Sequence, residues 1–342
     1  MSAADGIRDD ARLVYHPAGH DSALRAALED LRAGRWMAMR DLLAATGRDW
    51  GLRTSRSQVL AAAAARSDVV QVWRAEEPDS ADVTAMLARV AVERVLQAHR
   101  QGRREVFALL RTAREACLGA AHRSPKDPVP WVCLLALAQV DEQQELPEHR
   151  LTAPEQMLPS GPWGLLEEAR RRDPFNREAF HRMLKFWLAR PTGSIGDAID
   201  FAGAAVAWAP QSGSALSVLP LYVHAELYRR RRDREQLDAL IRRQWTRDHI
   251  AVDVGRALRA WFDHPADQPR APLDLNHLAH GLWAGGNFED AGRVFDAIGP
   301  YATTVPWSQV ADDPAAGERE FTWARGQCRS TAGRPGRRRR PG

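Results

Sequence analysis

The stretch that decides the fold covers residues 275–300 and reads LNHLAHGLWAGGNFEDAGRVFDAIGP. Leu275, Leu278 and Leu282 recur at helical spacing, which predicts one apolar stripe along a first helix. The pair Gly285-Gly286 follows, and glycine tolerates the left-handed backbone of a tight turn that a Cβ would resist. Because an apolar face resumes after this turn, the stretch predicts two short antiparallel helices.

The second predicted helix carries Ala291 and Phe295, and the small alanine lets the first helix approach closely. The stretch resembles the tetratricopeptide repeat, which has W-x2-L-G-x2-Y on its first helix and A-x3-F on its second. Leu278-Ala279 stand where the repeat has Leu-Gly, and Leu282 stands where it has Tyr. The match ends there, since Thr303 occupies the place of the terminal proline. The resemblance implies helical hairpins that stack into an α-solenoid.

Damaged copies of the same pattern recur over residues 105–300. Ala113 and Pro125 have the same separation as Ala198 and Pro210, which indicates a repeated unit. Alanine, leucine and arginine are abundant and β-branched residues are sparse, and this composition favours helices. We therefore predict an all-α chain, an α-solenoid of tetratricopeptide-like antiparallel helical hairpins.

The pattern also predicts how the chain is organised. We expect a flexible lead-in over residues 1–20 and a divergent N-terminal helical region over residues 21–100. Tetratricopeptide-like repeats are expected over residues 101–310, interrupted by a proline-rich inserted loop over residues 141–162. Residues 311–342 are predicted to form a weak helix followed by a flexible basic tail.

Composition limits the class of protein. The 342 residues are 44% hydrophobic and include 12 Trp, enough for a sizeable buried core. The net charge is +4, and part of the excess comes from Arg337–Arg340. Three scattered cysteines predict reduced thiols, and there is neither an apolar leader nor a long uncharged run. These features predict a cytoplasmic protein, and the alanine- and arginine-rich composition resembles that of bacteria with G+C-rich genomes.

The sequence lacks the common motifs of catalysis. No phosphate-binding GxxxxGK[ST] or nucleophile GxSxG is present, so we predict no enzyme activity and no cofactor. His277 and His280 are three residues apart, with His264 and Asp274 nearby, a set that a metal ion could use. Both histidines lie on the same predicted helix, and their side chains need not point to a common position. A structural role is therefore favoured, and no metal site is predicted.

The resemblance to tetratricopeptide repeats implies a binding groove. In such an array the first helices line the concave face, and polar or aromatic residues that point away from the core would contact a protein or peptide partner. Simple exposure to water is an equally good explanation of these residues. Matching the units position by position gives the candidate groove residues Glu178, His181, Lys185, Ser217, His224, Asn276, His280 and Trp283.

A basic patch offers a second hypothesis, in which the chain binds nucleic acid or another acidic ligand. It consists of Arg229, Arg230, Arg231, Arg232, Arg242 and Arg243. Aromatic residues for base stacking are not interleaved with these arginines, so a solvated helix end is favoured. A third hypothesis, an enzyme without recognisable motifs, has no residue pattern behind it. The prediction is therefore a non-catalytic scaffold that binds a protein or peptide.

Overall fold

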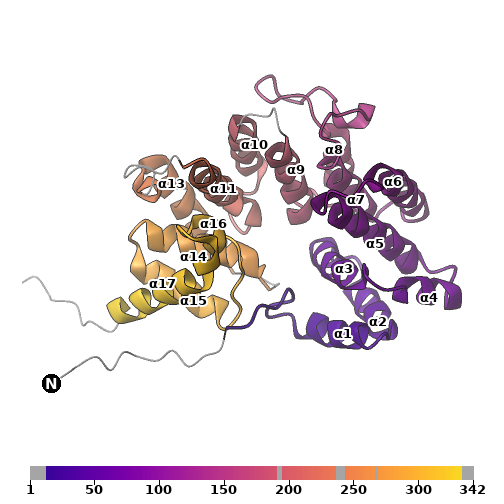
Figure 1. Cartoon of the computed structure of the whole chain (residues 1–342), viewed down its shortest axis with the longest axis horizontal. Helices are drawn as coiled ribbons and strands as arrows, with labels where there is room; N and C mark the ends of the chain where they lie inside the picture. Colours follow the sequence, from indigo (N-terminus) through magenta and orange to yellow (C-terminus); the bar gives the residue numbers. More distant parts are fainter. Residues whose placement is uncertain (1–12, 191–194, 236–242, 266–268, 333–342) are drawn as a thin grey trace, which may run out of the picture. The chain divides into compact units, whose positions relative to one another are not determined.

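The computed structural model describes residues 13–190, 195–235, 243–265 and 269–332 (Figure 1). The regular structure of these residues is helical, and they contain no strand apart from one isolated bridge between Leu151 and Gly161. The all-α prediction is therefore confirmed. The chain divides into two compact units, Asp21–Ala209 (the N-terminal unit) and Met1–His20 with Pro210–Gly342 (the C-terminal unit).

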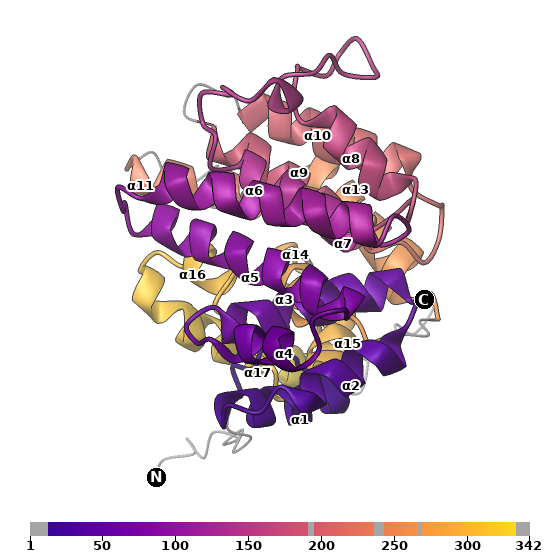
Figure 2. The same cartoon turned by 90° about the vertical axis from the view of Figure 1, so that its right-hand side faces the viewer.

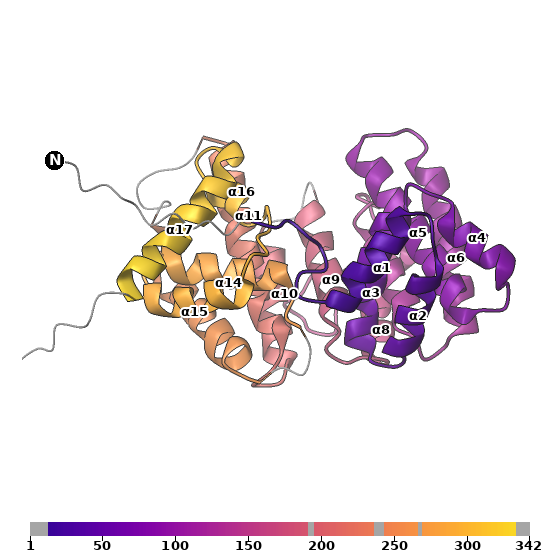
Figure 3. The same ribbon diagram turned by 90° about the horizontal axis from the view of Figure 1, so that it is seen from below.

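The N-terminal unit contains helices α1 to α10 and one short 3-10 turn. In chain order they are α1 (Ser22–Arg32), α2 (Met37–Thr46), α3 (Trp50–Ala64), α4 (Val69–Glu76), α5 (Ala81–Arg100), α6 (Val106–Arg123), α7 (Val129–Ala138), η1 (Pro147–His149), α8 (Trp163–Arg170), α9 (Arg177–Ala189) and α10 (Ile195–Trp208). Figure 3 shows α1, α2 and α3 grouped together, and α1 and α2 pack closely against each other.

Helix α7 is the centre of this unit. Its sequence VPWVCLLALA is apolar on every side, and nearly all of it is buried because it packs against α5, α6, α8 and α9. Helices α5 and α6 run side by side, as Figure 2 shows, and form the most extensive helix pair among the described residues. Side chains of Asp21, Ser80 and Asn176 cap α1, α5 and α9 by accepting hydrogen bonds from backbone N–H groups.

The boundary between the two units lies after residue 209. The sequence analysis instead expects a divergent helical region to end and the repeats to begin near residue 100. Residue 100 is the last of α5, and the chain turns there into α6, its closest packing partner. Residues 141–162 connect α7 to α8 with little regular structure besides η1 and the isolated bridge.

The C-terminal unit contains the remaining helices of the described residues. They are η2 (Ala215–Val218), α11 (Leu219–Asp233), η3 (Gln244–Thr246), α13 (Asp248–Arg256), the π-helical segment η4 (Ala257–Phe262), α14 (Pro272–Ala284), α15 (Phe288–Ile298), α16 (Trp307–Val310), η5 (Pro314–Ala316) and α17 (Gly317–Ala332). Figure 1 shows α14, α15 and α17 close together. Helix α15 packs against both α14 and α17.

The hairpin predicted from residues 275–300 is present as α14 and α15. Gly286, in the connection, has φ +84°, the left-handed conformation that the sequence required. Ala291 is completely buried, as are Leu278 and Phe295, so the small side chain lies in a packed core. The Asn287 side chain caps α15 by accepting a hydrogen bond from the Asp290 backbone N–H.

Residues 13–20, which the sequence analysis assigns to a lead-in, contact the end of helix α15. The backbone N–H of Val14 donates to the carbonyl of Pro300 at 2.8 Å, and Nε2 of His20 lies 3.0 Å from the carbonyl of Ala297. Ala18 is buried as well. These contacts attach the segment to the end of α15.

The weak helix predicted after residue 311 is the longer helix α17, which packs against α15 and α16. The expected basic tail lies outside the described residues. In the part of the chain that the structure describes, no helix combines the length and apolar character needed to cross a membrane.

Candidate functional site

Three predicted groove residues, Glu178, His181 and Lys185, lie on α9 in the N-terminal unit. Lys185 is exposed, but Glu178 and His181 are buried. Both Glu178 carboxylate oxygens accept hydrogen bonds from the Arg89 guanidinium of α5, at 2.7 and 2.6 Å. Arg182, one turn along α9, adds a bond at 3.0 Å to one of these oxygens. Glu178 therefore lies inside a doubly paired ion cluster and does not point away from the core.

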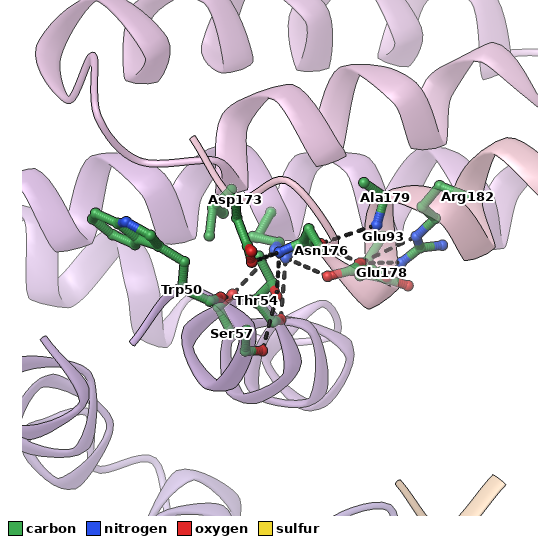
Figure 4. A network of polar contacts seen from close by, with 12 residues as sticks. Trp50, Thr54, Ser57, Glu93, Asp173, Asn176, Glu178, Ala179 and Arg182 are labelled. Carbon is green, nitrogen blue, oxygen red and sulfur yellow. Dashed lines mark hydrogen bonds and ion pairs between the residues drawn. The ribbon is translucent and has the colours of Figure 1, made fainter. Parts of the chain in front are cut away.

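This cluster continues across three helices, as Figure 4 shows. The Arg89 guanidinium also donates to the Ser57 hydroxyl at 3.2 Å and to the Thr54 carbonyl at 3.1 Å on α3. Asn176 joins α9 to α3, because its Nδ2 donates to the Thr54 hydroxyl at 3.2 Å. We call this set, with Glu178, Arg182 and Glu93, the α3–α5–α9 network.

The electrostatics of the network show how closely its charges are matched. Burial raises the pKa of Glu178, but the positive charges of Arg89 and Arg182 outweigh that effect and hold the pKa below its ordinary value. The buried carboxylate is thus ionised, with its oxygens occupied by guanidinium N–H groups. Such a satisfied group can join helices, but it offers little to an incoming ligand.

In the C-terminal unit, Ser217, His224 and Asn276 are also buried. The His224 Nε2 lies 3.0 Å from a carboxylate oxygen of Asp253. Asn276 donates to the Pro272 carbonyl at 2.8 Å and accepts from Trp307 Nε1 at 2.9 Å. This corrects the expectation that these side chains face away from the core.

The last two groove residues, His280 and Trp283, meet at a pocket of about 260 Å³. The described side chains that surround it are rich in aromatic rings and come from α11, η3, α14, α15, α16 and α17. They are Tyr228, Trp245, His280, Trp283, Ala284, Phe288, Val310, Glu320 and Gln327. We call this the aromatic pocket. Of the eight groove residues, only these two line it.

The residues that line the aromatic pocket differ in how far they are buried. Tyr228, Trp245 and His280 are buried, whereas Trp283 and Glu320 are half-buried and stand closer to solvent. The Trp245 and His280 rings meet edge to face, with centroids 4.6 Å apart. Trp283 is fixed in place because its Nε1 donates to the Gln327 side chain at 2.8 Å.

Two titratable groups of the aromatic pocket have shifted pKa values. Burial, with a smaller contribution from His277, lowers the pKa of His280 to about 3, so its imidazole is neutral near neutral pH. Burial also raises the pKa of Glu320, and the negative charge of Asp312 raises it further. No described residue forms an ion pair with Glu320.

The predicted basic patch is largely engaged in contacts within its own unit. Arg229 and Arg230 both pair with Glu226, at 2.6 and 2.9 Å. Arg232 donates to three backbone carbonyls, those of residues 308, 309 and 311. Arg243 is exposed and Arg231 is half-buried, while Arg242 lies outside the described residues.

The histidines weighed as metal ligands are packed separately. The His277 ring stacks on Tyr222 with centroids 3.6 Å apart, and its Nδ1 lies 2.8 Å from the Leu273 carbonyl. Within the described ranges, no group of three or more His, Cys, Asp or Glu side chains is placed to hold a metal ion.

Sequence reasoning missed Arg89, Trp245 and Glu320. Arg89 lies in the middle of an otherwise apolar stretch of α5, and a charge at such a position is a usable signal of a buried ion pair. Trp245 and Glu320 come from segments without a clear repeat pattern, so nothing in the sequence connected them to His280 and Trp283. No protein-family model matches this sequence, and the search of curated proteins gives no match.

Proposed function

We propose that the chain is a non-catalytic binding protein whose C-terminal unit holds a protein or peptide segment at the aromatic pocket. The observation that carries this proposal is an exposed tryptophan beside the pocket. Trp323 on α17 is 55% exposed, and its ring meets Trp283 edge to face with centroids 5.3 Å apart. Large aromatic side chains of this kind contribute strongly to binding when a partner covers them.

The chemistry of the pocket supports binding over catalysis. His280 has a pKa of about 3, which makes it a poor proton acceptor or donor near neutral pH. Trp283, by contrast, is held by Gln327 and by its aromatic neighbours, so it is a rigid contact surface before any partner arrives. Rigid groups lose little conformational entropy on binding, which favours affinity.

Of the resemblance to tetratricopeptide repeats, this proposal uses only the α14–α15 hairpin. The α14–α15 hairpin supports it, since Ala291 is buried in that hairpin as the repeat pattern requires. For the rest of the chain, further hairpins of this kind remain our proposal. The pocket is the better place for the partner, because five of the six groove residues outside it are buried.

A selection experiment tests the proposed function. Peptides would be selected from a random library on the full chain, and their affinities measured for the wild type and two variants. We expect Trp323→Ala to weaken binding at least fivefold, which corresponds to about 1 kcal/mol. Phe107→Ala is the matched control, since Phe107 is 64% exposed but lies on α6 in the other unit. Selected peptides that bind Trp323→Ala as tightly as the wild type would refute the assignment.

A further inference from the structure

We propose that the aromatic pocket recognises an organic cation, and that in the proposed function this cation is a Lys or Arg side chain of the partner segment. The second part of the inference rests on the proposed function, whereas the first does not. Three features of the pocket carry it: aromatic faces, a carboxylate without a counter-ion, and a buried ring nitrogen without a hydrogen bond.

The aromatic faces come from residues of several helices. Tyr228, Trp245, Trp283 and Phe288 all line the pocket. A cation over the face of such a ring is attracted by the electrons of the π-system, most strongly for Trp. Among the described residues no arginine guanidinium stacks on Trp245 or Trp283, although Arg270 and Arg293 stack on other rings of the same unit. Neither of these two rings is therefore occupied by an arginine of the described chain, although both line the pocket.

The carboxylate is that of Glu320, in the first turn of α17. It is half-buried, and no cationic side chain of the described chain pairs with it. Glu226 on α11 of the same unit is, by contrast, paired with Arg229 and Arg230. Because a partly desolvated carboxylate is costly without a counter-charge, the unpaired Glu320 indicates that a cation completes the site.

The ring nitrogen is Nδ1 of His280. It is buried and has no hydrogen-bond partner in the described part of the chain. With a pKa of about 3 the imidazole is neutral, so one of its two nitrogens is an acceptor near neutral pH. A buried polar group that lacks a partner is uncommon in folded proteins, so the described chain leaves the hydrogen-bonding capacity of His280 incomplete.

The size of the pocket limits the ligand. Its volume of about 260 Å³ lies below the roughly 300–1,000 Å³ of sites for drug-sized molecules. An amino-acid side chain or a short alkylammonium ion fits this limit. The acceptors Glu320 and His280 then favour a ligand that donates hydrogen bonds and carries positive charge over a neutral apolar one.

Titration of the full chain with n-butylammonium chloride tests the cation site, with 1-butanol as the neutral probe of similar size. Saturation-transfer NMR would report binding of each probe to the wild type, Glu320→Gln and Glu289→Gln. Glu289 is exposed on α15, so its substitution removes one negative charge from the same unit without touching the pocket. Thermal melts would verify that both variants remain folded, which we expect because the substitutions are nearly isosteric and neither side chain is fully buried.

We expect the wild type to bind butylammonium at least tenfold more tightly than butanol. Glu320→Gln should weaken butylammonium binding about tenfold, whereas Glu289→Gln should stay within twofold. Equal affinity for the two probes, or equal affinity of the wild type and Glu320→Gln for butylammonium, would overturn the cation site.

The peptides selected in the preceding experiment separate this inference from the proposed function. Replacing their Lys residues with norleucine should weaken binding about tenfold to the wild type but not to Glu320→Gln. Peptides that bind through Trp323 but tolerate norleucine would refute the inference that a basic side chain of the partner occupies the pocket. The proposed function would stand. Glu320-dependent binding of butylammonium, with no peptide bound at all, would support the cation site and overturn the proposed function.

Discussion

Replacing Arg89 with Met is the most direct test of what holds the N-terminal unit together. The substitution keeps an unbranched side chain of similar length but removes the guanidinium. Arg89 is almost completely buried and donates to four acceptors: two oxygens of Glu178, the Ser57 hydroxyl and the Thr54 carbonyl. After the change these acceptors stay buried without that donor.

The magnitude follows from what remains around Glu178. Removing one partner of a buried ion pair costs about 3–5 kcal/mol, because the other charge is left without compensation. Arg182 would still donate to Glu178 at 3.0 Å, so part of the compensation survives. We therefore expect the lower end of the range, about 3 kcal/mol less stability for the N-terminal unit.

Hydrogen exchange measured by mass spectrometry is the suitable assay, since a chain with two compact units need not unfold in one step. Peptides from α3, α5 and α9 report the free energy of opening at the network, and peptides from α14 and α15 serve as an internal reference. Arg171→Met is the matched control. Arg171 also pairs with two glutamates, Glu167 and Glu168, but its side chain is 63% exposed.

The control should cost less than about 1 kcal/mol, because exposed ion pairs contribute little. The reasoning is refuted if Arg89→Met opens α9 no more readily than Arg171→Met does. It is equally refuted if Arg89→Met and Glu178→Gln give strictly additive losses when combined. Residues that contact each other in one network should instead show a coupling of about 0.5–3 kcal/mol.

Two further predictions concern the same network and the C-terminal hairpin. The folded-state pKa of Glu178 lies below its ordinary value. The ionised Glu178 carboxylate therefore contributes its full stabilisation above the unfolded-state pKa of about 4.3, and this contribution is lost as the pH falls through the folded-state pKa. Urea unfolding of the N-terminal unit at pH 6 and pH 3 should therefore show a larger loss for the wild type than for Glu178→Gln, and equal losses would contradict it. Ala291→Leu should cost about 1–3 kcal/mol through overpacking, against a much smaller change for the less buried Ala297→Leu, as thermal melts would show.

The sequence predicted the features of this fold that are local. The α14–α15 hairpin depends on an apolar stripe, a glycine that adopts φ +84° and a small residue at 291, all within one short stretch. Each of these signals acts through near neighbours along the chain. For that reason the helices and the turn could be placed from the residues alone.

The candidate site was predicted less well, because it depends on contacts between distant segments. Glu178 was expected to face away from the core, since a charged residue at the edge of an apolar stripe usually contacts water. Its partner Arg89 lies 89 residues earlier, and nothing near Glu178 in the sequence reveals the pairing. Similarly, Trp283 was predicted from its position in the repeat pattern. Glu320 and Gln327 come from α17, and no repeat pattern in the sequence indicates that α17 contributes to the pocket.

The two buried polar regions differ in how completely their groups are satisfied, and this difference separates structure from binding. In the α3–α5–α9 network, the Glu178 carboxylate accepts hydrogen bonds from two guanidiniums of its own unit. In the aromatic pocket, Glu320 lacks a cation and His280 Nδ1 lacks a hydrogen bond among the described residues. A satisfied network stabilises the fold by itself, whereas an incomplete one gains free energy only when another molecule supplies the missing groups. The aromatic pocket is therefore where we propose that a ligand binds.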